Sequence, residues 1–262
     1  MADGYDRGVA AYEALWSPVI LPPAAALVPL LLRPGQPLVA DVGGGTGALL
    51  GAIRSAAPRA RVVTLDASAQ MLRAARARRG ASAVVADALA LPFRDGSVDA
   101  VMLAYVLFHV ADPWQAAAEA ARVLRPGGRA GIITWAWERE SRADAIWDRA
   151  LTAASVPPAP LRRVDAALDT PAGVTALLRS AGLAPERTWP QWLQHQWDRS
   201  SYWELATGWG ANRARLSRID AGARGRLLDR VHADLDRLDP AGFRWEGEIV
   251  CALAVKGTSA RA

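Results

Sequence analysis

The chain has 262 residues, of which 52% are hydrophobic and 22% charged, a balance typical of globular proteins and unlike that of disordered or fibrous chains. The single cysteine, Cys251, excludes an internal disulfide bond and fits a reducing compartment, so we expect a cytoplasmic protein. The net charge of +5 comes almost entirely from arginine, because Lys256 is the only lysine. The arginines are dispersed among acids, which favours a solvated surface over an RNA-binding face.

Residues 1–37 are predicted to form a helical cover. Tyr5, Tyr12 and Trp16 are spaced to share one helical face. The first residues carry acids and no apolar run, unlike a secretion signal. The apolar stretch 19–32 is interrupted by three prolines, so we expect no membrane span there.

Between residues 38 and 135, short apolar runs alternate with helical segments. The predicted strands are 38–42, 61–65, 83–86, 98–104 and 129–135. The predicted helices are 46–57, 68–79 and a third that begins at Asp112-Pro113 and ends at a turn over 125–128. This alternation predicts an α/β fold with a parallel sheet and helices on both faces.

The pattern is less regular after residue 135. Helices are predicted over 137–151, from Thr170-Pro171 to Gly182, and in several pieces over 198–238. Residues 186–197 have a mixed pattern that is compatible with a strand, and the apolar run 248–255 predicts a buried final strand.

The first predicted strand ends in a glycine turn, V-A-D-V-G-G-G-T-G over 39–47. A strand, a glycine turn and a helix start form the layout of a nucleotide site, because glycine allows positive φ and close approach of a ligand to the backbone. The glycines alone do not identify the ligand, since Gly43, Gly45 and Ala48 also satisfy the dinucleotide fingerprint G-x-G-x-x-G/A.

Three acids stand at the ends of three successive predicted strands: Asp41, Asp66 and Asp87. Ligands of open α/β sheets bind at this edge. A carboxylate at Asp41 would repel a pyrophosphate but attract an ammonium group, Asp66 can accept both hydroxyls of a ribose, and Asp87 with the Ala88 N–H can recognise an adenine edge. A ligand with these groups and no phosphate is S-adenosylmethionine.

At this point the sequence resembles the class I S-adenosylmethionine-dependent methyltransferases, and within them the small-molecule group that includes the quinone-biosynthesis enzymes. The resemblance rests on the glycine turn and on L-D-A-S-A-Q-M-L, A-D-A-L-A-L-P-F, D-G-S-V-D-A-V-M-L-A-Y-V-L-F-H-V and R-V-L-R-P-G-G, in order over 38–135. It implies a Rossmann-like, seven-stranded, mostly parallel sheet with an antiparallel last strand. It also implies one domain over 1–262, with a cover at 1–37, a cofactor core at 38–135 and a substrate-side half at 136–262.

The resemblance also implies roles for individual residues. Gly43, Gly44 and Gly45 would approach the methionine portion of the cofactor, beside Asp41. Asp66 and Ala67 would hold the ribose. Met71, Asp87 and Ala88 would contact the adenine, and Ala104 and Tyr105 would lie near the reactive methyl group.

The catalytic candidates are His109 and Tyr105, with helix packing as the alternative role for His109. The proposed substrate pocket is aromatic and contains Tyr12, Trp16, Trp137, Tyr202 and Trp203. No cluster of His, Cys and acids has metal-ligand spacing, so no metal is expected.

The expected function is methyl transfer to a small, apolar or aromatic molecule by a monomer or homodimer. One alternative is an RNA or protein methyltransferase, although a chain with a single lysine lacks the K-D-K-E-like tetrad of the 2′-O-methyltransferases. Another is a cofactor-binding module or cyclase that transfers no methyl group. A dinucleotide dehydrogenase is disfavoured by Asp41.

Overall fold

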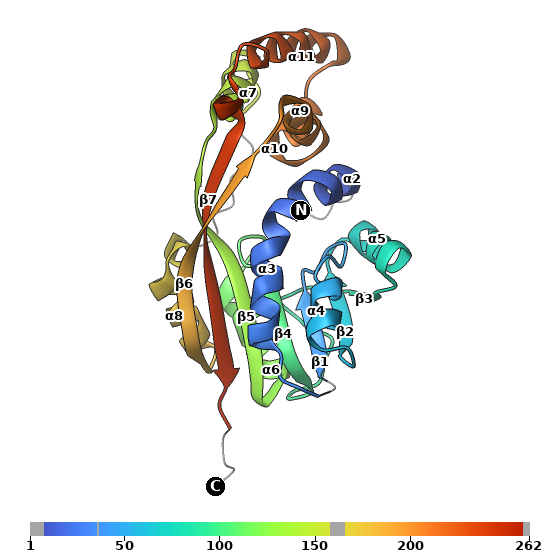
Figure 1. Ribbon diagram of the computed structural model, residues 1–262, viewed down its shortest axis with the longest axis vertical. Coiled ribbons are helices and arrows are strands. Elements are labelled where there is room, and N and C mark those ends of the chain that lie inside the picture. Colours follow the sequence, from blue (N-terminus) through green and yellow to red (C-terminus); the bar gives the residue numbers. More distant parts are fainter. Residues whose placement is uncertain (1–7, 36, 158–165, 259–262) are drawn as a thin grey trace.

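The computed structural model describes residues 8–35, 37–157 and 166–258, so Tyr5 lies outside the described residues. Its sheet has seven strands in the order β3-β2-β1-β4-β5-β7-β6 (Figure 1). The strands are β1 (Leu38–Val42), β2 (Arg61–Asp66), β3 (Ser82–Val85), β4 (Val98–Ala104), β5 (Leu124–Arg139), β6 (Leu183–Gln196) and β7 (Arg244–Lys256). The first five run parallel, and β7 is antiparallel to both β5 and β6, which confirms the predicted mostly parallel α/β sheet.

Helices cover both faces of the sheet. α3 (Ser17–Leu31) and α4 (Leu50–Ala56) pack on one face, and α6 (Pro113–Val123) and α8 (Pro171–Ser180) on the other. Successive side chains of β4 point to opposite faces of the sheet and so belong to two separate cores. Ala100 and Met102 face α3, whereas Val101 and Leu103 face α6. α5 (Ala69–Arg79) packs beside α4.

Helix boundaries in the core follow local sequence signals. Ser68 caps α5 by accepting a hydrogen bond from the Met71 N–H at 3.1 Å, and Gly80 ends that helix in the left-handed conformation. Asp112 caps α6 in the same way, with Pro113 in the first turn. The predictions for these two helices are confirmed, but α4 begins at Leu50, because residues 46–49 form the turn that leaves the glycine segment.

The N-terminal segment is one continuous helix: α2 (Val9–Ala11), a π-helical turn η1 (Tyr12–Trp16) and α3. Pro22, Pro23 and Pro29 lie inside α3 and do not interrupt it, contrary to expectation. Pro22 and Pro29 are on the exposed side, where water can hydrate the carbonyls that they leave without a donor.

By length and composition alone, Val9–Leu31 is apolar and long enough to cross a membrane. In the structure, however, α3 lies along the sheet next to β5 (Figure 1). Leu27, Val28 and Leu31 are each at most 2% exposed in the core that they form with the sheet. Burial of such side chains against a protein core accounts for the apolar composition of this helix.

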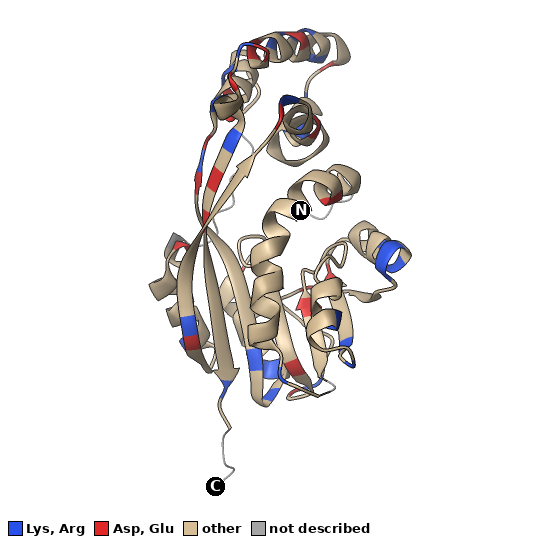
Figure 2. Cartoon of the chain, in the orientation of Figure 1, with Lys and Arg blue, Asp and Glu red and all other residues tan. Residues whose placement is uncertain are grey.

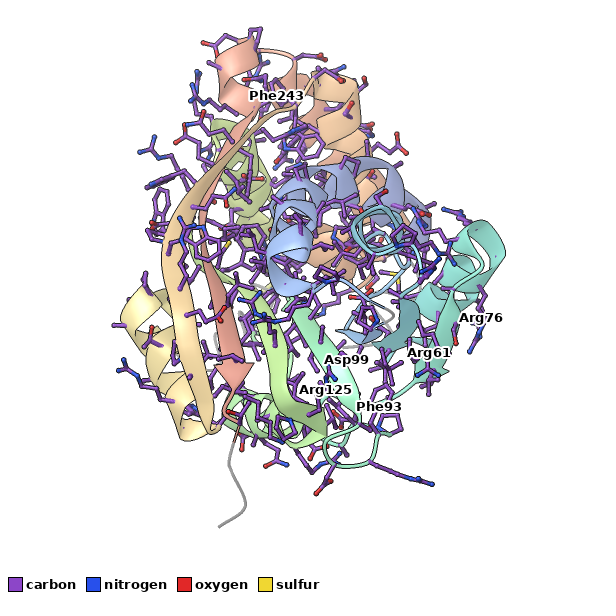
Figure 3. All side chains as sticks on the ribbon, turned by 60° about the horizontal axis from the view of Figure 1, so that its bottom comes forward. Arg61, Arg76, Phe93, Asp99, Arg125 and Phe243 are labelled. Atoms are coloured by element: carbon purple, nitrogen blue, oxygen red, sulfur yellow. The ribbon has the colours of Figure 1, made fainter. Side chains whose placement is uncertain are left out.

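β5 is longer than predicted at both ends. It begins at Leu124, and residues 125–128 bulge out opposite a single residue of β4, because Leu124 pairs with Val98 while Arg129 pairs with Ala100. The bulge is held by the Arg125 guanidinium, 2.6 Å from the Asp99 carboxylate; Figure 3 labels both residues.

The predicted helix over 137–151 is wrong at its start. Residues up to Arg139 continue β5 because β7 pairs with them, and α7 (Arg142–Ala153) begins only after Ser141. Ser141 and Asp144 form a capping box at that point.

The extended ends of β5, β7 and β6 carry a helical lobe (Figure 1). It consists of α7 with α9 (Arg199–Gly208), α10 (Gly210–Leu216) and α11 (Ala221–Leu235), as the helical pattern of 198–238 predicts. Trp147, Tyr202, Val231 and Phe243 pack in its core. The predicted strand over 186–197 is confirmed as β6.

A partly buried ion pair on α6 ties this helix to the loop before β4. Two nitrogens of Arg122, Nε and Nη2, donate to the two oxygens of Glu119 at 2.7 and 2.8 Å, and Glu119 also accepts from the Leu91 N–H at 2.7 Å. The hydrogen bonds from Arg122 lower the pKa of Glu119.

We predict that Glu119→Ala lowers the free energy of unfolding by about 2–3 kcal/mol at pH 7, because it removes two hydrogen bonds from Arg122 and leaves the Leu91 N–H without its acceptor. Since the pKa of Glu119 is lowered in the folded state, this stabilisation is present above the ordinary carboxyl pKa and is lost as pH falls. Urea unfolding at pH 7 and pH 3 measures both effects. Asp95→Asn is the control: Asp95 pairs with the same arginine but is 80% exposed, so its loss should cost about 0.5 kcal/mol or less.

Candidate active site

A cavity of about 680 Å³ lies at the carboxyl ends of β1, β2, β3 and β4, covered by η1 and the start of α3. Its size is within the range of small-molecule sites. The predicted site residues that border it are Tyr12, Trp16, Gly43, Gly45, Asp66, Ala67, Met71, Asp87, Ala88, Ala104, Tyr105 and His109. The topology thus brings together predicted residues from five separate segments, as expected where parallel strands end at one edge.

The glycine turn is shaped by close packing. Gly43 and Gly45 have positive φ angles of 66° and 55°, which side-chain-bearing residues rarely adopt. A Cβ on Gly44 would lie 2.3 Å from an oxygen of Asp41, so the backbone of the turn rests directly on that carboxyl group. Gly44 and Asp41 therefore lie behind the cavity wall and support it.

Asp41 is buried without a partner. Its side chain is 1% exposed, and neither carboxyl oxygen accepts a hydrogen bond from the described residues. Burial, together with the nearby charge of Asp66, raises the pKa of Asp41 to about 7. A buried acid in this state lowers stability unless a donor or positive charge reaches it, so it indicates a site prepared for a cationic or hydrogen-bonding group.

The other two acids are held by backbone. The oxygens of Asp66 accept from the Gly45 N–H at 2.9 Å and the Ser68 N–H at 2.8 Å. Asp87, at the exposed rim, accepts from the Leu89 N–H at 2.9 Å. These bonds fix the orientation of each carboxylate, and the remaining lone pairs can still accept hydrogen bonds from a ligand.

Tyr105 occupies a strained position at the end of β4. Its φ of 60° is unusual for a residue with a side chain, and its N–H donates to the Ile133 carbonyl at 2.8 Å. The hydroxyl is buried with no hydrogen-bond partner among the described residues, and burial raises its pKa. Tyr105 is therefore protonated at neutral pH and is a hydrogen-bond donor, which makes it unsuitable as a base.

His109 follows on the same side of the cavity. Burial lowers its pKa to about 4, so the imidazole is neutral at pH 7 and can accept a hydrogen bond, whereas its protonated form is disfavoured. Its ring lies 4.1 Å from that of Phe108, which also borders the cavity.

Aromatic rings form the wall opposite the acids. Trp135 lies 5.2 Å from Tyr105, 6.1 Å from Trp16 and 5.6 Å from Trp245, measured between ring centroids. Trp135 and Phe108 border the cavity but were not among the predicted substrate residues. The alternation of β5 is the signal that could have identified Trp135, since it lies two residues beyond the buried Ile133 on the same face.

Three predicted substrate residues do not border this cavity. The β5–β7 register shifts between Trp135 and Trp137, and Trp137 is 38% exposed against Trp192. The Tyr202 hydroxyl donates to Asp144 at 2.7 Å inside the helical lobe. Trp203 packs 5.6 Å from Trp147 in that lobe. Spacing in the sequence could not reveal these positions, because they depend on a strand bulge and on lobe packing.

The π-helical turn closes the cavity between the sheet and the lobe. Glu13 pairs with Arg78 and Arg79 of α5 on one side, and the Tyr12 ring packs 4.9 Å from Trp209 on the other. Burial and the charges of Asp66 and Asp41 raise the pKa of Tyr12 to about 12. Single π-helical turns inside longer helices often mark functional sites.

The described residues contain no group of three or more His, Cys, Asp or Glu side chains placed to bind a metal ion. The residues that line the cavity offer hydrogen-bonding groups instead, among them the acids, two tyrosine hydroxyls, Ser68, His109 and the indole N–H groups of Trp16 and Trp135.

We predict that Asp41→Asn raises the free energy of unfolding of the ligand-free protein by about 2–4 kcal/mol at pH 8, because each unit of raised pKa corresponds to about 1.4 kcal/mol. A carboxyl whose folded pKa is raised destabilises the fold progressively as pH increases from its ordinary pKa to about 7. The difference between variant and wild type should therefore vanish near pH 4. Equal stability of the two proteins at pH 8 in chemical unfolding would contradict the burial of an unpaired carboxylate.

Residues 40–132 match the family model of the methyltransferase domain. The chain is 42% identical over 100 residues to the ubiquinone/menaquinone biosynthesis C-methyltransferase UbiE of Dinoroseobacter shibae, covering 36% of this chain and 40% of the relative. It is 40% identical over 111 residues to the demethylmenaquinone methyltransferase of Thermus thermophilus, covering 40% and 50%. It is also 38% identical over 128 residues to the human probable tRNA methyltransferase 9B, covering 45% and 27%. The chain thus spans at most half the length of these relatives.

Solved structures match over most of the chain. A putative methyltransferase from Bacillus halodurans has a TM-score of 0.57 at 19% identity, covering 89% of this chain and 98% of the other. The [4+2]-cyclase SpnF has a TM-score of 0.52 at 21% identity, covering 90% and 82%. These similarities establish the fold. Residues 40–132, which the family model matches, include Gly43, Asp66, Asp87 and Tyr105, which line the cavity. Over residues 40–132 the chain therefore matches the methyltransferase-domain family, on a fold that it shares with solved methyltransferases.

Proposed function

We propose that the protein transfers a methyl group from S-adenosylmethionine to a small organic molecule that is apolar or aromatic. The observation that carries the proposal is the division of one cavity into two walls. Asp66 and Asp87 line one side with buried Asp41 behind it, whereas Trp16, Tyr105 and Trp135 line the other. A polar nucleoside and an apolar acceptor would each have a matching wall.

The residues present fit the cofactor. The backbone of Gly43 and Gly45 borders the cavity and suits an amino-acid portion, and the unpaired Asp41 carboxyl directly behind this turn would attract its ammonium group. Asp66 would accept the ribose hydroxyls, and Asp87 with Ala88 would bind the adenine edge. Met71, which is 1% exposed on the cavity wall, would pack on the adenine ring.

When bound, the cofactor supplies a methyl group that its sulfonium already activates, so the protein contributes alignment and exclusion of water. Trp16, Tyr105 and Trp135 form a dry wall whose ring faces attract positive charge. His109 borders the cavity with a neutral ring and would accept a hydrogen bond from an acceptor that carries a proton, whereas burial disfavours complete transfer of that proton to the ring. The Tyr105 hydroxyl would orient the acceptor by donating a hydrogen bond.

The named relatives support this class of substrate. The UbiE proteins are named as quinone-biosynthesis C-methyltransferases, so a quinone-like or natural-product ring is a fitting acceptor. Because another relative is named as a probable tRNA methyltransferase and a solved neighbour is a cyclase, the test must include tRNA and must measure product formation. A cytoplasmic location and one domain over the whole chain belong to the same proposal.

We predict that the protein binds S-adenosylmethionine and S-adenosylhomocysteine but not NAD in calorimetric titration. Asp66→Ala should weaken S-adenosylmethionine binding about 10- to 100-fold, because two hydrogen bonds to a charged acceptor are lost. Asp95→Asn, which alters an exposed acid away from the cavity, should leave affinity unchanged. Unchanged affinity in Asp66→Ala would disprove the ribose role, and absence of any binding would refute the cofactor assignment.

We further predict that Trp16→Leu raises the KM for the methyl acceptor about tenfold, because it removes ring area from the apolar wall. Cofactor affinity should change by no more than about twofold. Trp203→Leu should lower stability without changing KM, since Trp203 packs within the lobe. The acceptor is first identified by mass-detected methyl transfer over small-molecule pools and tRNA, and a tRNA-only product would overturn the proposed substrate class.

A further inference from the structure

The positive charge of the chain is concentrated in one stretch and is not dispersed. Residues 42–86 contain seven arginines and one acid, Asp66, so this stretch carries a formal charge of +6 and the rest of the chain carries −1. The arginines are Arg54, Arg59, Arg61, Arg73, Arg76, Arg78 and Arg79. We call the surface that they form the arginine face. It accounts for the whole positive excess of the protein.

Contacts of three of these arginines join α4, α5 and β3 at the β3 end of the sheet. Arg54 of α4 donates to the Arg79 carbonyl of α5 at 3.2 Å, and Arg76 of α5 donates to the Ala83 carbonyl of β3 at 2.5 Å. Figure 2 shows blue and no red on α4 and α5. Figure 3 labels Arg61 and Arg76 at this edge, with their side chains directed outward.

Little of this charge is neutralised. Glu13 pairs with Arg78 and Arg79, but among the described residues no acid forms a salt bridge with the other five arginines. All except Arg79 are exposed at the surface. Such a field attracts a polyanionic partner over roughly a Debye length, about 10 Å at moderate salt.

Exposed aliphatic side chains accompany the charge. β3 is an edge strand, and its Val84 and Val85 are 39% and 54% exposed. Val85 also borders the cavity, so the cavity reaches the surface at the arginine face. Residues 42–86 contain no aromatic side chain, which single-stranded nucleic acid recognition by base stacking would require.

We propose that the arginine face binds an anionic lipid bilayer, so that an apolar methyl acceptor passes from the membrane into the cavity at the β3 edge. The arginines contact lipid phosphates, and Val84 and Val85 enter the interfacial layer. The choice of partner rests on the proposed function, because an apolar acceptor is the reason for membrane contact. Binding itself requires neither cofactor nor turnover.

The test is co-sedimentation of the full chain with phosphatidylcholine vesicles with and without phosphatidylglycerol, at low and high salt. We expect binding to the anionic vesicles alone and its loss at high salt. Arg61→Gln/Arg73→Gln should lower the partition coefficient about thirtyfold. Neither side chain makes an ion pair or a hydrogen bond with another of the described residues, so the substitutions should not disturb the fold. Arg224→Gln/Arg230→Gln on α11, at the far end of the molecule, is the matched control and should bind as the wild type does (Figure 1).

Three results would overturn the proposal: no binding to anionic vesicles at low salt, equal binding to pure phosphatidylcholine, or an equal loss in the α11 control. Binding of tRNA that the Arg61→Gln/Arg73→Gln variant loses, without vesicle binding, would assign the face to nucleic acid instead. Vesicle binding by a protein that fails to bind S-adenosylmethionine would contradict the proposed function and leave the membrane proposal standing.

Discussion

The contact between the Gly44 backbone and the Asp41 carboxyl is the constraint on which the site depends. It sets the path of the turn that leaves β1, so that the Gly44 N–H bonds to the Leu65 carbonyl at 3.0 Å and the Gly45 N–H reaches Asp66. Two neighbouring strands are thereby locked at the edge where the cavity opens. The acid that supports the turn is left unpaired among the described residues, which lowers the stability of the fold at this point.

The aromatic wall arises from a different part of the fold. β4, β5 and β7 contribute Tyr105, Trp135 and Trp245, and the N-terminal helix adds Trp16. The positive φ of Tyr105 turns its side chain at the end of β4, where the strand would otherwise continue. Polar and apolar walls therefore come from opposite halves of one sheet.

The N-terminal helix connects these parts. Through Glu13 it is tied to α5, and through Tyr12 it packs on Trp209 of the helical lobe. Its apolar residues are those of a core helix, buried on the sheet beside β5. The same arrangement leaves the β3 edge, with its exposed valines and unpaired arginines, as the uncovered side of the cavity.

Local sequence signals determined the strands and caps of the core, as the capped helices α5 and α6 illustrate, and the acids at three strand ends indicated one ligand edge. These signals suffice because they act within a few residues. Three features were decided by tertiary structure alone. The N-terminal prolines stay within a helix, and residues 137–139 form a strand because they pair with β7. Trp135, and not Trp137, borders the cavity. Each of these depends on pairing or packing with residues distant in the chain, which overrides local preference.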